Sequence, residues 1–224
     1  MRPIRAIPAT LVALAIAAPA ADARPTIRVE TVSRELVPAL TSGSVRSYVD
    51  TDGALHALPA RSALGQVVAL GARLDVPIDV QFFSSFNSGL LQRFGSGHSA
   101  TGGWQFTVDG APPPVGADLT VLPSNAEVVW WLIDDFTTQG GLLPLDLDLV
   151  SKSSRGVVKF RVTRFDSGSG KVKGAAGATL RVAGRSLKVP ASGLVSVRLK
   201  RGTRFHARAT ASNSIRSDRV SGKV

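Results

Sequence analysis

Two short aromatic stretches constrain the fold of this chain more than any other feature. Residues 104–108 alternate, with Trp104 and Phe106 on one side of an extended strand, and the Asp-Gly pair at 109–110 is typical of a hairpin turn. Residues 128–133 form the second stretch, and together the two hold all three tryptophans of the chain. We therefore predict that they pair as one hairpin at a thickly packed place in the protein.

Four aromatic side chains of this hairpin are the candidate ligand-binding residues: Trp104, Phe106, Trp130 and Trp131. Aromatic rings offer large faces on which a sugar or another ring stacks. Neighbouring residues of a strand point to opposite faces, so Trp130 and Trp131 cannot belong to one platform. The alternative is that most of the four rings fill the core of a sheet.

The first 23 residues have the pattern of a secretory signal. Arg2 and Arg5 precede an apolar run over residues 11–18, and an Ala-x-Ala sequence ends at Ala23. The run is shorter than the roughly 20 apolar residues of a membrane-spanning helix. We predict cleavage after Ala23, no transmembrane anchor after cleavage, and a secreted or cell-envelope-associated protein.

The absence of cysteine removes several classes of function at once. The chain has no disulfide framework, no thiolate zinc site and no cysteine nucleophile. Its three histidines are far apart, and no two have the spacing of helical metal ligands. Residues 50–53 resemble the opening of a calcium loop, but no acidic ligand follows at the required position. We predict no metal site and no cofactor.

Charge divides the chain into two unequal domains. Residues 24–150 hold 7 Lys and Arg against 13 Asp and Glu, a balance of −6, whereas residues 151–224 hold 18 against 2, a balance of +16. The whole chain carries +11. This asymmetry indicates two domains with different surfaces, and it gives the carboxy-terminal domain an attraction for polyanions.

The first domain is predicted to combine strands with one helix. Residues 26–32 alternate apolar and polar side chains, which is typical of a strand with one buried face. Apolar residues then recur at helical spacing over residues 64–74, with Ser62 as the N-cap and Pro77 beyond the end. We expect this helix to lie across the sheet.

The order of these features resembles the transcobalamin-like carboxy-terminal domain, a β-grasp-like module, over about residues 25–136. Residues 103–110 read Gly-Trp-Gln-Phe-Thr-Val-Asp-Gly where the family has Gly-Trp-x-Tyr-x-Val-Asn-Gly, and residues 128–131 read Val-Val-Trp-Trp. The resemblance implies an α+β fold for residues 24–136, with a mixed sheet and one main helix. In cobalamin carriers a large helical barrel completes the site. This chain has no such barrel, so no cobalamin contact is carried over to it.

The rest of the chain is predicted to be a linker followed by an all-β sandwich. Residues 137–154 are rich in carboxylates and glycines and form the predicted linker. Residues 155–224 alternate apolar and basic side chains, with turns at the spacing of a small sandwich. The run over residues 177–197 resembles carboxypeptidase regulatory-like and other immunoglobulin-like modules, which implies a basic, non-catalytic immunoglobulin-like domain.

Basic side chains occupy the outward positions of nearly every predicted strand in this second domain. The residues expected to attract a polyanion are Arg198, Lys200, Arg201, Arg204 and Arg208. The expected partner is an anionic cell-wall polymer or polysaccharide. Specific nucleic-acid binding is not expected, because no stacking aromatics or recognition helix lie among the charges. The alternative is a solvated face that only keeps the domain soluble.

These features predict a secreted, non-enzymatic binding protein, and two other hypotheses stay open. One is a serine hydrolase, because residues 97–101 come close to a Gly-x-Ser-x-Gly elbow with Ser99 as nucleophile and His206 as a candidate base. Thr101 in place of the last glycine and the lack of an α/β-hydrolase pattern speak against it. The other hypothesis is a structural spacer that binds nothing.

Overall fold

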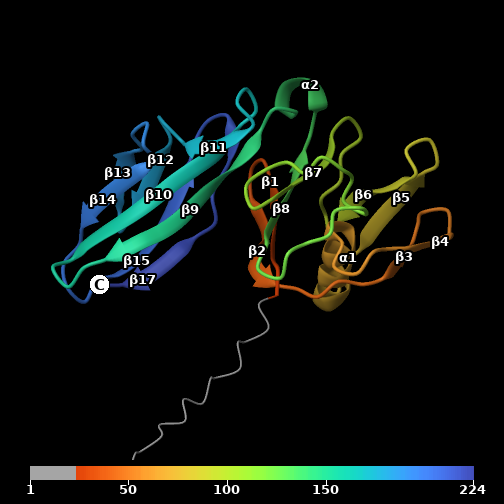
Figure 1. Cartoon of the computed structure of the whole chain (residues 1–224), viewed down its shortest axis with the longest axis horizontal. Helices are drawn as coiled ribbons and strands as arrows, with labels where there is room; N and C mark the ends of the chain where they lie inside the picture. The colour runs from red at the N-terminus through yellow and green to blue at the C-terminus, as the bar shows by residue number, and fades with distance from the viewer. Residues whose placement is uncertain (1–23) are drawn as a thin grey trace, which may run out of the picture.

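The computed structural model describes residues 24–224, which form two halves lying side by side (Figure 1). The predicted signal sequence, with its cleavage site at Ala23, lies outside the described residues. Over the described range the protein is mostly β, with strands in both halves and only two helices.

The amino-terminal half contains the longer helix and the first eight strands. Its elements are β1 (Thr26–Thr31), β2 (Glu35–Thr41), β3 (Ser47–Val49), β4 (Leu55–Ala57), α1 (Ala63–Leu74), β5 (Ile78–Phe83), β6 (Ser88–Phe94), β7 (Gly103–Val108) and β8 (Glu127–Ile133). The short helix α2 (Phe136–Gln139) connects the halves. The carboxy-terminal half consists of β9 (Leu143–Lys152), β10 (Val157–Asp166), β11 (Lys171–Gly174), β12 (Thr179–Val182), β13 (Arg185–Lys188), β14 (Leu194–Arg198), β15 (Arg204–Thr210), β16 (Ser214–Ile215) and β17 (Val220–Lys223).

Strands β2, β1, β8 and β7 form one mixed sheet, in this order. β1 and β8 run parallel at its centre, while the outer strands β2 and β7 are antiparallel to their neighbours. Phe106 lies opposite Trp130, and Gln105 lies opposite Trp131. The predicted pairing of the two aromatic stretches is therefore confirmed, and it supplies one edge strand and one central strand of the sheet.

Helix α1 crosses the face of this sheet that is turned away from the carboxy-terminal half (Figure 1). Ser62 starts the helix, because its Oγ accepts a hydrogen bond from the backbone N–H of Gly65 at 3.0 Å. Leu64, Val67 and Leu70 recur at helical spacing and are fully buried. The predicted helix is confirmed.

The central strands direct alternate residues to opposite faces of the sheet. Ile27 and Val29 of β1 join Val128 and Trp130 of β8 in the core beneath α1. Intervening residues of both strands point to the other face; they are Arg28, Glu30, Val129, Trp131 and Ile133. This second face therefore carries both charged and large apolar side chains.

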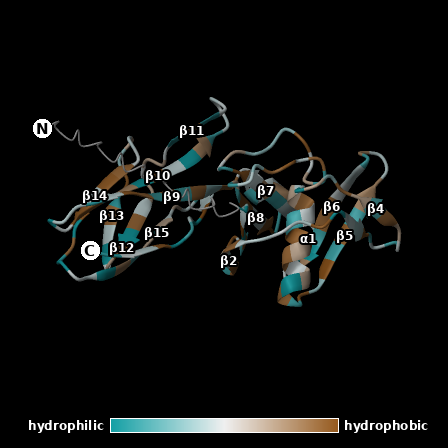
Figure 2. Ribbon diagram, turned by 60° about the horizontal axis from the view of Figure 1, so that its bottom comes forward, coloured by the Kyte–Doolittle hydropathy of each residue, from teal (hydrophilic) through white to brown (hydrophobic). Residues whose placement is uncertain are grey.

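The carboxy-terminal half is built from two sheets that share one core. One sheet has the order β11-β10-β9-β16, with β14 also paired to β10, and the other has the order β13-β12-β15-β17. Phe160 of the first sheet meets Phe205 of the second edge to face, with ring centroids 5.7 Å apart. Hydrophobic (brown) and hydrophilic (teal) bands alternate along several strands (Figure 2), as expected of strands with one buried face.

The segment predicted as a linker, residues 137–154, instead contributes a strand to this half. Residues Leu143–Lys152 form β9, which lies between β10 and β16. Leu145 and Leu147 point into the core and alternate with Asp146 and Asp148. The carboxylates that suggested a linker are the outward positions of a strand, which is why the prediction missed it.

The carboxy-terminal half covers the sheet face that α1 leaves free. Val129, Trp131 and Ile133 of β8 pack there against Ile215 of β16, with Leu143 partly buried beside them. In Figure 1 the mixed sheet lies between α1 and the carboxy-terminal half. β8 is consequently buried on both faces, which explains its almost continuous apolar sequence.

Candidate anion-binding surface

A buried charged network joins the two halves beside this apolar contact. Arg28 and Glu30 are 1% and 0% exposed, and Arg28 Nη1 lies 2.8 Å from Glu30 Oε1. The carboxy-terminal half adds two arginines: Arg216 Nε lies 3.1 Å from Glu30 Oε2, and Arg208 Nη2 lies 3.2 Å from Glu30 Oε1. Arg208 also pairs with Glu35 of β2. The network therefore crosses from one half to the other.

Arg208 belongs to this network and not to the free basic surface. The alternation of its strand predicts an exposed polyanion-binding residue, but its guanidinium is half-buried and contacts both Glu30 and Glu35. Its Nε donates to the Ser217 carbonyl at 2.9 Å. Alternation along β15 shows that Arg208 points outward; it does not show that the amino-terminal half lies over that position.

Further carboxylates gather near Arg28 at the junction. The pKa of Glu127 is raised to about 7, first by burial and then by the charge of Asp146, with Asp218 and Asp148 adding to the effect and Arg28 opposing it. Burial likewise raises the pKa of Asp146. The junction therefore contains a group that titrates near neutral pH.

The four predicted ligand-binding aromatics are divided between two cores. Trp130 is 2% exposed beneath α1, and Trp131 is 1% exposed at the junction, so the prediction that they point to opposite faces is confirmed. Phe106 stacks on Trp130 with centroids 4.8 Å apart, and Trp104 packs edge to face against Phe94. Neither Trp130 nor Trp131 has a free ring face. Only the half-buried Trp104 and Phe106 are left for contact with a ring.

Four of the five predicted cations come together at one end of the carboxy-terminal half. Arg198 ends β14, Lys200 and Arg201 lie in the turn that follows, and Arg204 begins β15. All four side chains are exposed. These four cations are close in the sequence, and the turn between β14 and β15 keeps them together at this end.

Four more exposed cations, from other segments, lie at the same end of the molecule. Arg185 Nη1 donates to the Arg198 carbonyl, and Lys152 Nζ donates to the Lys223 carbonyl, both at 3.1 Å. Lys223 lies directly opposite Arg204 in the sheet. These exposed cations form one surface, the basic end, which comprises Lys152, Arg155, Arg185, Arg198, Lys200, Arg201, Arg204 and Lys223. The sequence pattern does not predict the four cations that lie outside residues 198–204, because only the pairing of β9, β12, β13 and β17 brings them to this end.

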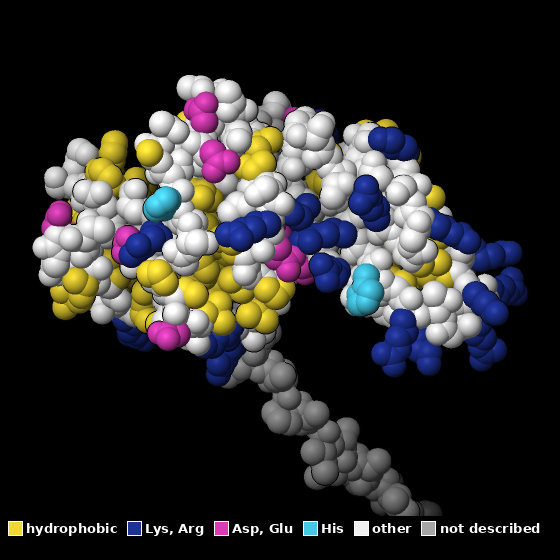
Figure 3. Space-filling model, turned by 180° about the vertical axis from the view of Figure 1, so that it is seen from behind, with side chains coloured by type: hydrophobic (Ala, Val, Ile, Leu, Met, Phe, Trp, Pro, Cys, Tyr) yellow, Lys and Arg dark blue, Asp and Glu magenta, His cyan; other side chains and the backbone are white. Residues whose placement is uncertain are grey.

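Most cations of the carboxy-terminal half have no carboxylate partner. Among the described residues, only Lys173, Arg208 and Arg216 of its 18 Lys and Arg form ion pairs with carboxylates. Figure 3 shows dark blue side chains spread over this half and no magenta at its outer end. Arg204 and Lys223 face each other although opposed like charges destabilise a sheet. The cations of the basic end therefore form a concentrated positive charge, and none of them is ion-paired with a carboxylate among the described residues.

Ser99, the candidate nucleophile, stabilises a turn. Its Oγ donates to the Asp134 carbonyl at 2.9 Å and accepts from the backbone N–H of Gly102 at 2.8 Å. His206, its candidate base, bonds through Nδ1 to Ser221 Oγ at 2.6 Å. The structure does not bring the serine and the histidine together.

The fold and this surface define a mostly β protein in which a sheet-and-helix half is joined by buried charges to a strongly cationic two-sheet half. No protein-family model, curated protein or solved structure matches the chain. In residues 24–224 no three His, Asp or Glu side chains are placed to hold a metal ion. No helix in that range combines the length and apolar character needed to cross a membrane.

Proposed function

We propose that this is a non-enzymatic binding protein whose basic end holds an anionic polymer of the cell envelope, such as an acidic polysaccharide. The observation that carries the proposal is the opposed pair Arg204 and Lys223 within a cluster of exposed cations that form no ion pair with a carboxylate in residues 24–224. Like charges directly opposite each other destabilise a sheet, and solubility alone does not require them to be opposed. An anionic chain lying across them offsets their repulsion.

A polymer suits this surface better than a single small anion. One pair of unit charges about 4 Å apart in water gains only about 1 kcal/mol. A polymer contacts several cations of the basic end at once, so these small gains combine. Because exposed charges are screened over about 8–10 Å at ordinary ionic strength, such binding weakens as salt rises.

Retention of the full chain on immobilised polygalacturonate, followed through a salt gradient, tests the proposal. We expect retention at low salt and release as salt increases. The triple variant Lys200→Gln, Arg201→Gln, Arg204→Gln should elute at markedly lower salt, because it removes three of the eight cations of the basic end. Absence of retention at low salt would instead favour a structural spacer.

A matched control separates the basic end from net charge. The triple variant Arg24→Gln, Arg46→Gln, Arg73→Gln loses the same charge from exposed positions of the amino-terminal half. We expect it to elute close to the unsubstituted protein. Equal shifts in the two triple variants, or retention that does not respond to salt, would contradict a binding surface at the basic end.

We also infer that the amino-terminal half is a β-grasp-like unit and the carboxy-terminal half an immunoglobulin-like one. The order β2-β1-β8-β7, with parallel central strands and α1 across one face, supports the first inference. Two sheets around one core support the second. In this arrangement the amino-terminal half packs against one end of the carboxy-terminal half, and the basic end stays free at the other.

A further inference from the structure

Arg164 differs in position from every cation of the basic end. Val158, Phe160 and Val162 of β10 point into the core of the carboxy-terminal half, and Arg164 continues the same side of the strand where that core stops. Its side chain is half-buried. Arg164 lies opposite Leu145 of β9, close to Leu143, which packs at the junction, so it is at the end of the two-sheet half nearest the amino-terminal half.

Two hollows meet at Arg164, and both have walls rich in hydroxyl and amide groups. The first has a volume of about 370 Å³, and its polar lining includes Ser167, Asn213 and Ser214. The second, of about 610 Å³, shares Arg164 and Asn213; it adds Thr179, Lys188, Thr210 and Ser212. Both volumes lie within the roughly 300–1,000 Å³ of small-ligand sites.

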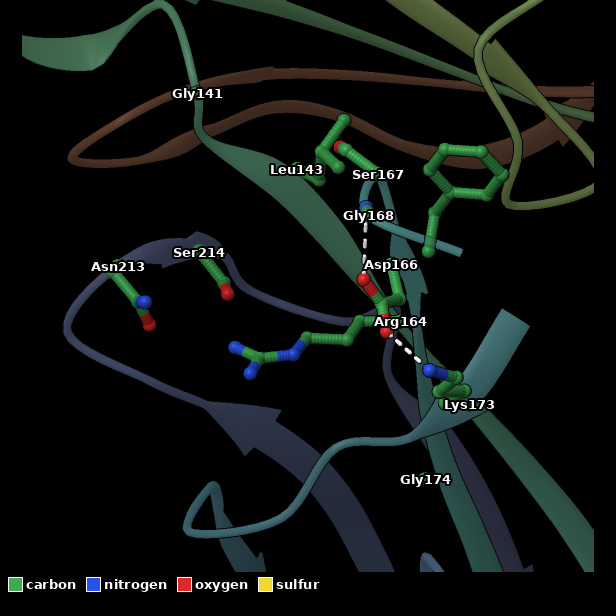
Figure 4. Close-up of a pocket in the computed structure, with 11 residues that line it drawn as sticks. Gly141, Leu143, Arg164, Asp166, Ser167, Gly168, Lys173, Gly174, Asn213 and Ser214 are labelled. Carbon is green, nitrogen blue, oxygen red and sulfur yellow. Dashed lines mark hydrogen bonds and ion pairs between the residues drawn. The ribbon is translucent and has the colours of Figure 1, made fainter. Parts of the chain in front are cut away.

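The charge of Arg164 is not neutralised inside the first hollow. Among the described residues, its side chain forms no ion pair with a carboxylate, and in Figure 4 the guanidinium points toward Asn213 and Ser214 with no dashed line to it. Asp166 is the one carboxylate among the described residues that line this hollow, and it is paired with Lys173, whose Nζ lies 2.5 Å from Oδ2. That hydrogen bond lowers the pKa of Asp166, so the pair stays ionised and mutually satisfied.

We propose that this hollow binds one acidic sugar unit, with Arg164 holding the carboxylate and Ser167, Asn213 and Ser214 contacting the sugar hydroxyls. A guanidinium binds a carboxylate through two parallel hydrogen bonds, and serine and asparagine both donate and accept hydrogen bonds as sugar hydroxyls require. Phe165 is the one aromatic residue among the described residues that line the two hollows, so the walls lack the succession of stacked aromatic side chains on which single-stranded nucleic acids bind. A saccharide therefore fits these walls better than a nucleotide.

The inference rests on the proposed function for its ligand class, but it concerns a different place. The hollow and the basic end lie at opposite ends of β10, which has ten residues and spans about 30 Å. A trisaccharide is much shorter than this distance, so it occupies the hollow without reaching the basic end. A long polymer engages both sites.

Calorimetric titration of the full chain with trigalacturonate tests the hollow by itself. We expect binding that Arg164→Gln weakens at least about tenfold, because it removes a charge-assisted pair of hydrogen bonds. Arg161→Gln is the matched control: Arg161 lies on the same strand, is exposed on the outer side and carries the same charge. We expect this control to change the affinity less than twofold. Asn213→Ala, which alters no charge, should weaken binding about threefold.

Several outcomes would overturn the proposal. Equal losses in Arg164→Gln and Arg161→Gln would show a general charge effect, and equal binding of neutral maltotriose would show that the carboxylate is not recognised. Oligothymidylate that binds as tightly and depends equally on Arg164 would exclude the saccharide class. Absence of trigalacturonate binding in the unsubstituted protein would remove the hollow as a site, while retention on the polymer would leave the basic end standing.

Discussion

Glu127 combines a strand position with surroundings that belong to the other half of the protein. It lies on β8, yet Asp146, Asp148 and Asp218 of the carboxy-terminal half act on its charge together with Arg28. Because its pKa is raised from 4.5 to about 7, the folded protein keeps a proton that the unfolded chain releases. The contribution of Glu127 to the free energy of unfolding is therefore fully present below pH 4.5 and is lost as the pH rises from 4.5 to about 7.

Glu127→Gln should stabilise the protein above neutral pH. The amide stays uncharged at every pH, so the variant avoids the cost of ionising a carboxylate among other carboxylates. We expect a gain in the free energy of unfolding of about 1–3 kcal/mol at pH 8 and little change near pH 4.5. Urea unfolding at the two pH values measures the difference.

The exposed turn residue Asp52 provides the control for this experiment. Asp52→Asn removes a carboxylate without touching the junction, and it should change stability equally little at both pH values. A Glu127→Gln variant that is destabilised at pH 8, or that shows no pH dependence relative to the unsubstituted protein, would contradict the burial of this carboxyl at the junction.

The period of two along strands predicts the direction of a side chain but not what it meets. The opposite facing of Trp130 and Trp131 follows from their adjacency alone. Arg208 and Arg204 lie on the same outward face of β15, yet the first meets Glu30 and Glu35 while the second meets Lys223 across the sheet. Residues from distant segments decide this difference, so no local pattern contains it.

Among the elements, α1 has a side-chain cap at Ser62, while the Thr120 and Ala117 carbonyls accept hydrogen bonds from the N–H groups of Ala63 and Leu64. Ser62 is fully buried, and its Oγ accepts a hydrogen bond from the Gly65 N–H, which has no partner within the helix. We expect Ser62→Ala to lower the free energy of unfolding by about 1 kcal/mol, measured by urea denaturation. Ser84→Ala, at an exposed turn position, serves as the control and should be nearly neutral. Equal small effects would contradict the cap.

The fate of β9 and α1 shows which elements a sequence pattern identifies. Helical spacing over residues 64–74 is interrupted by few polar residues, so the pattern is strong. In β9 the alternation of Leu143, Leu145 and Leu147 is equally regular, but acidic residues between them are also typical of a loop. Pairing with β10 makes this segment a strand and not a loop. Because β10 follows later in the chain, the sequence of β9 alone does not show the pairing.

At the scale of the whole molecule, Arg216 holds the two halves together. Besides Glu30, it contacts the backbone of the β1–β2 turn: Nη1 donates to Ser33 O at 2.8 Å, and Nη2 donates to Thr31 O and Val32 O at 3.0 Å. We expect the unsubstituted protein to unfold in one calorimetric transition. Arg216→Gln should lower the free energy of unfolding by about 3 kcal/mol, because it leaves the buried Glu30 less well paired. The variant should also unfold in two calorimetric transitions.

Arg219→Gln is the natural comparison for this variant. Arg219 is exposed three positions further along and has no ion pair in the described structure, so its loss should leave the single transition intact. An Arg216→Gln variant that melts in one transition at an unchanged temperature would show that the halves are coupled by the apolar contact alone.

The division of charge predicts two units, but it does not predict their contact. The signal lies in totals over long segments, and the acidic and basic totals say only that the units attract each other. The actual junction uses Arg28 within the acidic half, and it places carboxylates from both halves near one another. Such a contact follows from the shapes of two completed sheets.

The junction also affects the order in which this protein can be made. The residues that cover the outer face of the mixed sheet include Ile215 and Arg216, which are synthesised more than eighty residues after β8. Until then, a folded amino-terminal half exposes the apolar stripe of Val129, Trp131 and Ile133. Translation products that stop before residue 214 therefore expose an apolar sheet face. The growing chain is prone to associate with other chains through this face until β16 and β17 have been synthesised.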